Sequence, residues 1–223
     1  MRKRIVILGS TGGIGSCLSK ELSLKNNLYL GYRDDVKFDS LKSSINSQNL
    51  LSGEIIDIED FDFSKNFLNN ANDYMGSIDC IVSCLGSLLL KPAHLTSEED
   101  LVNVFNTNVF SSFSIIKHSF KHLRKNGGNM IFFSSAAANV GLKNHDAIGS
   151  AKGALSSLVT SSASTYAKYN IRYSKAFNDK FAFKVNFSYD MAKDWVADDY
   201  ITNVDASGNA LSAFDMRGQP NFN

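Results

Sequence analysis

Residues 5–15 read IVILGSTGGIG, and this stretch decides the fold of the chain. Its first four residues form a short apolar run that a glycine ends, which is typical of a strand buried on both faces. Leu18 and Leu22 continue the helical spacing of Ile14, so the stretch predicts a strand, a tight turn and a helix. Such a turn offers bare backbone and free helix N–H groups to the diphosphate of a dinucleotide. A plain tight turn is the alternative, but the place between a buried strand and a helix favours a nucleotide site. We expect this site to be lined by Gly9, Ser10, Thr11, Gly13, Ile14 and Gly15.

The alternation of apolar strands and amphipathic helices continues along the chain. Strands are expected near 28–30, 54–58, 78–82 and 130–133, and helices near 41–45, 61–75, 96–124 and 146–169. Thr96 and Glu99 have the spacing of a capping box at the start of one helix. The pattern predicts an α/β protein with a doubly wound, Rossmann-like parallel sheet that helices cover on both faces. We expect this domain to occupy residues 1–172.

The bulk composition argues against several classes of protein. The chain has 223 residues, of which 43% are hydrophobic and 20% charged, and its net charge is +1. These values are ordinary for a soluble globular protein and favour neither a nucleic-acid nor a membrane partner. The three cysteines are odd in number and lack the spacing of a metal site, so we expect buried, reduced thiols and no metal. The apolar run at residues 5–8 is too short for a signal-peptide core, and a cytoplasmic location is expected.

Further polar residues follow the glycine turn in a distinctive order. They are Asp57 after the third expected strand, Ser83–Gly86 after the fourth, Asn108 in a helix, Ser134 and Ser135 after the fifth strand, and Lys152 in the last helix. Together with the glycines, these landmarks resemble the short-chain dehydrogenase/reductase family over about residues 4–172. The resemblance implies hydride transfer between a nicotinamide cofactor and a small carbonyl or alcohol substrate.

The resemblance also implies a role for each landmark. Asp57 lies by the adenine, and Gly86 belongs to the cofactor site. Asn108 orders a proton-relay water, and Ser135 positions the substrate oxygen. Lys152 holds the nicotinamide ribose and lowers the pKa of a catalytic tyrosine.

The residues after the second expected strand bear on the choice of cofactor. Family members that prefer NAD carry an acid there, whereas this chain has Arg33. A guanidinium forms charge-assisted hydrogen bonds with a 2′-phosphate, so we predict NADP(H), with NAD(H) as the alternative. Asp34 and Asp35 follow at once and could weaken this preference. Arg33 could also be no more than a solvated surface charge.

The position of the catalytic tyrosine holds isoleucine. Counting thirteen residues on from Ser135, or four back from Lys152, leads in both cases to Ile148. An aliphatic side chain transfers no proton, so we expect impaired hydride transfer, or a protein that binds NADP(H) without catalysis. His145 is a candidate replacement, because imidazole has a suitable pKa. Its alternative is a loop or capping histidine.

The pattern changes near Ile171. Residues 180–189 alternate strictly between apolar and polar side chains, which predicts a half-exposed strand. Residues of about 173–200 resemble a segment of TonB-dependent outer-membrane receptors, so we interpret the chain as a possible chimera joined near residue 172. The alternative is a divergent native ending whose strand pairs on the sheet edge. We expect residues 173–223 to form an atypical tail of one strand and loops, which leaves the family's C-terminal part incomplete or replaced.

The resemblance implies an oligomer as well. Family members pack the helices expected at about 99–124 and 146–169 against a twin subunit, which implies a homodimer or tetramer. Such an apolar face could equally be covered within the chain.

Overall fold

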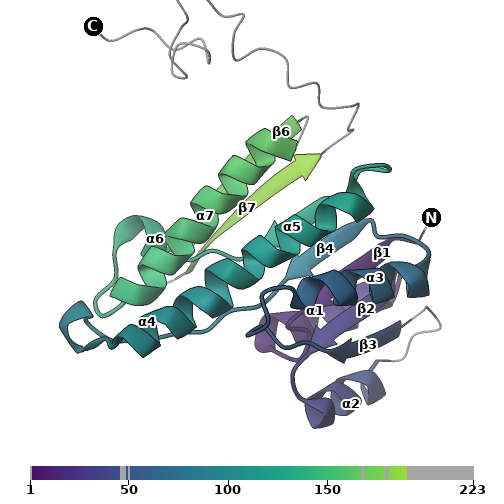
Figure 1. Ribbon diagram of the computed structural model, residues 1–223, viewed down its shortest axis with the longest axis horizontal. Coiled ribbons are helices and arrows are strands. Elements are labelled where there is room, and N and C mark those ends of the chain that lie inside the picture. The colour runs from purple at the N-terminus through teal and green to yellow at the C-terminus, as the bar shows by residue number, and fades with distance from the viewer. Residues whose placement is uncertain (1, 46–48, 50, 167–168, 179–180, 190–223) are drawn as a thin grey trace, which may run out of the picture. The chain divides into compact units, whose positions relative to one another are not determined.

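A five-stranded parallel sheet forms the centre of the computed structural model, which describes residues 2–45, 49, 51–166, 169–178 and 181–189 (Figure 1). Its strands are β1 (Arg4–Leu8), β2 (Asn27–Tyr32), β3 (Leu51–Ile55), β4 (Cys80–Ser83) and β5 (Asn129–Phe132). Their order in the sheet is β3-β2-β1-β4-β5. The chain therefore runs outward from β1 to β3 and returns to the other side of β1. In such a sheet, ligands bind where the order reverses, beyond the carboxyl ends of the central strands.

Alternate side chains of β1 point to opposite faces of the sheet, and both faces are covered. Val6 and Leu8 pack with residues of α3 (Phe63–Met75) and α5 (Ser111–Leu123), helices that lie side by side over the sheet (Figure 1). Ile5 and Ile7 pack on the other face with α1 (Gly13–Ser23) and α2 (Asp35–Ser43). This two-sided burial explains the continuous apolar run of β1 and confirms the doubly wound α/β class.

Four further helical segments complete the described part of this domain. They are α4 (Glu98–Phe105), the π-helix Asn106–Phe110 (η2), α6 (Ala137–Val140) and α7 (Asp146–Tyr166), with a short 3₁₀ turn at Ala93–Leu95 (η1). The helix expected at 96–124 is thus continuous through η2 but changes its pitch there. No described helix has the length and apolar character needed to cross a membrane.

The expected third strand, 54–58, is wrong by three residues. Leu51 pairs with Leu28 and Ile55 with Tyr32, so the strand begins earlier and ends at Ile55. At the sheet edge only half-buried side chains mark the start of β3, and Gly53 approaches Leu30 O too closely for any side chain. A search for apolar runs therefore missed its first residues.

The capping box lies one residue later than expected. Ser97 Oγ accepts from the backbone N–H of Asp100 at 3.1 Å, and Asp100 Oδ2 accepts from the backbone N–H of Ser97 at 3.2 Å. Thr96 does not cap α4, because its hydroxyl donates to Pro92 O at 3.1 Å.

The alternating segment forms a strand, as predicted. β7 (Phe181–Tyr189) pairs antiparallel with β6 (Tyr169–Asn178) in a separate two-stranded sheet. Because β6 extends to Asn178, the expectation of a single strand in 173–223 is wrong. β7 pairs with β6 instead of with an edge of the five-stranded sheet. The remainder of the expected tail, residues 190–223, lies outside the described residues.

The cysteines agree only in part with the expectation of buried thiols. All three are free, but Cys17 on α1 is exposed, whereas Cys80 and Cys84 are half-buried. Burial raises the pKa of both Cys80 and Cys84 to about 11, so these two thiols stay protonated. Among the described residues, no group of three or more His, Cys, Asp or Glu side chains is placed to hold a metal ion.

Candidate cofactor and active site

The glycine turn brings β1 and β4 together at the point where the strand order reverses. Gly9 has a φ of +73°, and a Cβ there would lie 3.0 Å from the carbonyl carbon of Cys84. A Cβ on Gly15 would collide with Gly9 O. Both positions therefore require glycine. Gly13 has open space around it, so packing within the chain does not explain its glycine.

The first turn of α1 has N–H groups that no side chain caps among the residues that the structure describes. Gly12 is the N-cap residue and makes no side-chain hydrogen bond. Ser10 is fully buried, and its Oγ donates to Gly31 O at 3.1 Å, so this hydroxyl fixes the turn to β2. The side chain of Ile14 is 54% exposed and is therefore accessible to a ligand. Thr11 lies beside α2, where it lines an open groove of about 420 Å³.

Two acids, Asp34 and Asp35, follow Arg33 at the end of β2. Asp34 caps α2 by accepting from the backbone N–H of Lys37 at 3.1 Å. Burial, followed by the nearby Asp35 carboxylate, raises the pKa of Tyr32. The side chain of Arg33 is exposed.

Asp57 lies two residues beyond the end of β3 and is exposed. Its Oδ1 accepts from the backbone N–H of Glu59 at 3.0 Å, which forms a tight turn. The side chain thus stabilises the loop and keeps a second carboxylate oxygen.

Gly86, Asn108 and Lys152 come from distant parts of the sequence and meet at one point. A Cβ on Gly86 would lie 3.3 Å from Asn108 Oδ1 and 3.5 Å from Lys152 Nζ. Asn108 is 1% exposed, and its Oδ1 has no hydrogen-bond partner among the described residues. An unpaired buried oxygen costs about 1–3 kcal/mol. This oxygen is therefore available to accept a hydrogen bond from water or from a bound molecule.

The π-helix η2 holds Asn108 in this orientation. Asn108 Nδ2 donates to Val104 O at 2.9 Å and to Ser87 Oγ at 3.2 Å. Thr107, Ser111 and Ser112 also bond to the carbonyl four residues before each, and such bonds compete with the regular helix ladder. π-Bulges are frequent at functional sites.

Lys152 lies on α7 and is nearly buried. Its Nζ donates to Phe133 O at 2.9 Å, just beyond the end of β5. Burial lowers the pKa of Lys152 to about 8, because the charged ammonium loses solvation. Among the described residues, no carboxylate forms an ion pair with it.

The two serines after β5 differ in their surroundings. Ser134 Oγ donates to Lys152 O at 3.1 Å and lies 2.8 Å from Ser156 Oγ, so it holds α7. Ser135 Oγ accepts from the backbone N–H of Ala137 at 3.2 Å and keeps its own proton for another acceptor. Ser135 is therefore the serine with a hydroxyl available to a substrate.

Ile148 is part of an apolar cluster. It is 3% exposed and packs with Val104, Ala147 and Ala151. His145 precedes α7, and its Nδ1 lies 2.7 Å from Lys143 O in its own loop. One ring nitrogen is thus engaged locally, which favours the interpretation of His145 as a loop residue.

Comparison with known proteins decides the family. The sequence profile of the short chain dehydrogenase family matches residues 3–177. The chain belongs to the short-chain dehydrogenase family. A hydroxynaphthalene reductase-like protein, Arp2, of Metarhizium anisopliae is 29% identical over 168 residues, which cover 72% of this chain and 61% of that protein. A tropinone reductase homolog of Arabidopsis thaliana is 26% identical over 174 residues, 76% of this chain and 66% of the relative. The chain thus spans about three fifths of the length of the first of these curated relatives.

Solved structures share the fold at lower identity. A short-chain type dehydrogenase/reductase from Mycobacterium ulcerans superposes with a TM-score of 0.68 at 20% identity, covering 74% of this chain and 64% of the other. An alcohol dehydrogenase from Thermococcus sibiricus, complexed with 5-hydroxy-NADP, has a TM-score of 0.69 at 20% identity, with 72% and 70% covered. These likenesses confirm the Rossmann-like fold of this short-chain dehydrogenase.

Several groups at the site were not found by sequence reasoning. The carbonyl of Phe133 accepts a hydrogen bond from Lys152, and the hydroxyl of Ser87 accepts one from Asn108. The hydroxyl of Ser156 forms a hydrogen bond with that of Ser134. Backbone carbonyls carry no sequence signal. Ser87 follows the Ser83–Gly86 landmark directly, and that position was the available clue.

Proposed function

We propose that this short-chain dehydrogenase binds NADP(H) and catalyses hydride transfer between it and a small carbonyl or alcohol substrate, at a rate lowered by Ile148. The observation that carries the proposal is the N-terminus of α1, where Gly12 supplies no side-chain cap and Gly13 has open space around it. The free N–H groups of such a helix N-terminus suit a diphosphate.

The remaining residues fit the two ends of the cofactor. Arg33 would hold the 2′-phosphate, and Asp57 would lie by the adenosine. At the other end, Lys152 would hold the nicotinamide ribose, and the unpaired Oδ1 of Asn108 would accept from an ordered water or a ligand hydroxyl. Reduced NADP supplies the hydride when bound. Ser135 would orient the substrate oxygen, and His145 is one candidate for the proton donor.

A second candidate function is NADP(H) binding without turnover. Ile148 favours it, because this position lies inside an apolar cluster and carries no proton. Under this proposal the glycine turn and Arg33 keep their roles, and the substrate end of the site does no chemistry.

Calorimetric titration with NADPH and NADH tests both candidates at once. We expect NADPH to bind more tightly, and Arg33→Ala to weaken NADPH while leaving NADH unchanged. Loss of charge-assisted hydrogen bonds worth about 1.5–3 kcal/mol corresponds to roughly 10- to 150-fold in the dissociation constant. Tighter binding of NADH by the native chain would reject the NADP preference. Oxidation of NADPH across a panel of carbonyl compounds then separates an enzyme from a binding protein.

We propose in addition that the chain is a chimera joined near residue 172. The profile match to residue 177 and the separate pairing of β6 with β7 support this proposal. Sequencing genomic DNA and transcript across the codons near residue 172 tests it, because a reading frame that continues from there into the family's own C-terminal part would contradict the junction.

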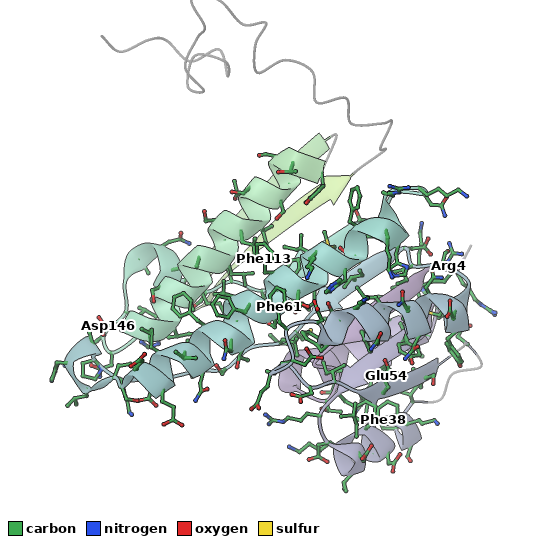
Figure 2. All side chains as sticks on the ribbon, viewed as in Figure 1. Arg4, Phe38, Glu54, Phe61, Phe113 and Asp146 are labelled. Atoms are coloured by element: carbon green, nitrogen blue, oxygen red, sulfur yellow. The ribbon has the colours of Figure 1, made fainter. Side chains whose placement is uncertain are left out.

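A homodimer or tetramer is proposed from exposed aromatic side chains on α5 and its neighbours. Phe113 is 50% exposed and lies 6.3 Å, centroid to centroid, from the half-exposed ring of Phe61 (Figure 2). Light scattering of the purified chain would show a monomer if this face is covered in another way.

The three free cysteines also support a reducing location such as the cytoplasm, which fractionation of cells would test.

A further inference from the structure

The proposed carbonyl reduction needs an acid, and the tyrosine position does not supply one. We propose that Lys152 is the catalytic acid of this chain, and that its ammonium group protonates the substrate oxygen directly. This inference rests on the proposed function and assigns to Lys152 a task beyond holding the ribose.

The step balances without a further reactant. The carbonyl carbon gains the hydride that the reduced cofactor supplies, and the π electron pair moves to the oxygen. The oxygen takes a proton from Lys152 Nζ, which becomes a neutral amine. The alcohol leaves, the cofactor is oxidised, and the amine regains its proton from water. In the reverse reaction the neutral amine acts as the base.

The geometry directs Nζ toward a ligand. Its bond to Phe133 O uses one of the three N–H donors of an ammonium group. The point above Gly86 lies 3.5 Å from Nζ and 3.3 Å from the unpaired Oδ1 of Asn108. A donor and an orphaned acceptor thus face the same small space, as expected where a hydroxyl or carbonyl group is to bind.

The electrostatics of the site suit an acid that operates near neutral pH. Because Lys152 is buried and lacks a carboxylate partner among the described residues, its proton is held less tightly than in water. Its pKa of about 8 leaves most molecules protonated at pH 7 and makes transfer easier than from an exposed lysine.

The other landmark side chains are less suitable donors. Ile148 has no exchangeable proton, and the amide of Asn108 already donates to Val104 O and Ser87 Oγ. The hydroxyl of Ser135 donates a hydrogen bond but has no pKa near neutrality. His145 is the remaining titratable group, and its Nδ1 is engaged by its own loop.

The test compares Lys152→Met and Lys152→Arg with Lys125→Met, a matched substitution of an exposed lysine. Binding of NADPH is measured by calorimetry, and NADPH-dependent reduction is followed from pH 6 to 10. The native chain should lose activity tenfold per pH unit above about 8. Lys152→Met should lose about 10²–10⁴-fold in kcat, together with this pH dependence.

Lys152→Arg separates acid catalysis from positioning. Arginine keeps the charge and the hydrogen bonds but does not release its proton in this range, so it should remain inactive. Independently of activity, a carbon-13 NMR titration of labelled lysines should show one resonance that titrates near pH 8 and is missing in Lys152→Met.

Several results would overturn the inference. Full turnover in Lys152→Arg is one such result, and a Lys152→Met variant that still loses activity above pH 8 is another. A third is a His145→Ala variant in which the loss of activity above pH 8 disappears. If the native chain binds NADPH but reduces no carbonyl, the acid role of Lys152 is refuted and cofactor binding stands. If neither coenzyme binds, the proposed function itself fails, and this inference fails with it.

Discussion

Replacing Ile148 by tyrosine tests directly whether the substrate end of the site is intact. The change places a phenol at the position that in other family members carries the catalytic hydroxyl. Ile148→Phe is the matched control, because it adds the same ring at the same buried position without the hydroxyl. We expect the tyrosine variant to turn over substrate much faster than the phenylalanine variant.

The magnitudes follow from the surroundings of Ile148. A positioned acid contributes about 10²–10⁴-fold, equivalent to very roughly 3–5 kcal/mol of activation free energy. At 3% exposure, with Val104 and Ala151 packed around it, the position has little room. Overpacking of this kind costs about 1–3 kcal/mol of folding free energy. Both variants bear this folding cost, so the ratio of their kcat values reports the contribution of proton transfer alone.

The assay is NADPH oxidation with saturating cofactor and a carbonyl panel, together with thermal melts of all three proteins. The two ring variants should melt at similar, lowered temperatures and differ by at least about 100-fold in kcat. Equal turnover in both, with NADPH bound by each, would refute the reasoning. It would mean that a hydroxyl carried from this position in the apolar cluster does not reach the substrate.

Three further predictions concern the framework of the site. Gly15→Ala should abolish NADPH binding and destabilise the fold by more than about 1 kcal/mol in chemical denaturation, because its Cβ meets backbone. Gly13→Ala, with open space around it, should unfold at the same denaturant concentration as the native chain or at a higher one, because an unstrained Gly→Ala change stabilises by about 0.4–1 kcal/mol. Asp79→Asn should cost about 1–3 kcal/mol at pH 7, because Asp79 accepts from the Arg4 backbone N–H at 2.8 Å and from its Nε at 2.9 Å. The Arg4 side chain holds the pKa of Asp79 below its usual value, so the loss should begin to shrink as the pH falls below about 4 and vanish only below the lowered pKa; an equal loss at pH 3 and pH 7 would contradict it. Burial lowers the pKa of His118, so the native chain should lose stability as the pH falls below about 6.5. In His118→Gln, denaturation curves at pH 5 and 7 should lie closer together than in the native chain.

The sequence predicted those helices and strands that are marked by a pattern of apolar side chains within the element itself. β1 was found because both of its faces are buried, so that every residue from Ile5 to Leu8 is apolar. β3 was misplaced because an edge strand buries only part of each side chain, and Gly53 has no side chain to detect. The start of α4 was missed by one residue, because Thr96 and Ser97 both carry a hydroxyl that can cap a helix. In the structure Ser97 is the cap, and the Thr96 hydroxyl bonds to Pro92 O instead.

The candidate site depends on contacts that spacing along the chain does not encode. Nothing in the local sequence says that Gly86, Asn108 and Lys152 meet, and only the resemblance to a family placed them together. The same resemblance made Ile148 visible as a substitution. It did not indicate that Ile148 is packed among Val104, Ala147 and Ala151, because that depends on how α4 and α7 lie against each other.

The two ends of the site differ in what holds them. The proposed diphosphate end is the glycine turn between β1 and α1, and β1 is hydrogen-bonded to β2 on one side and to β4 on the other. The substrate end depends on side chains carried by η2, α7 and the end of β5, a strand that pairs within the five-stranded sheet only with β4. A perturbation near residue 172 would therefore reach the second end first, since α7 leads directly toward it. Binding of the adenosine diphosphate half should persist in variants whose catalysis is lost, and the two activities should separate experimentally.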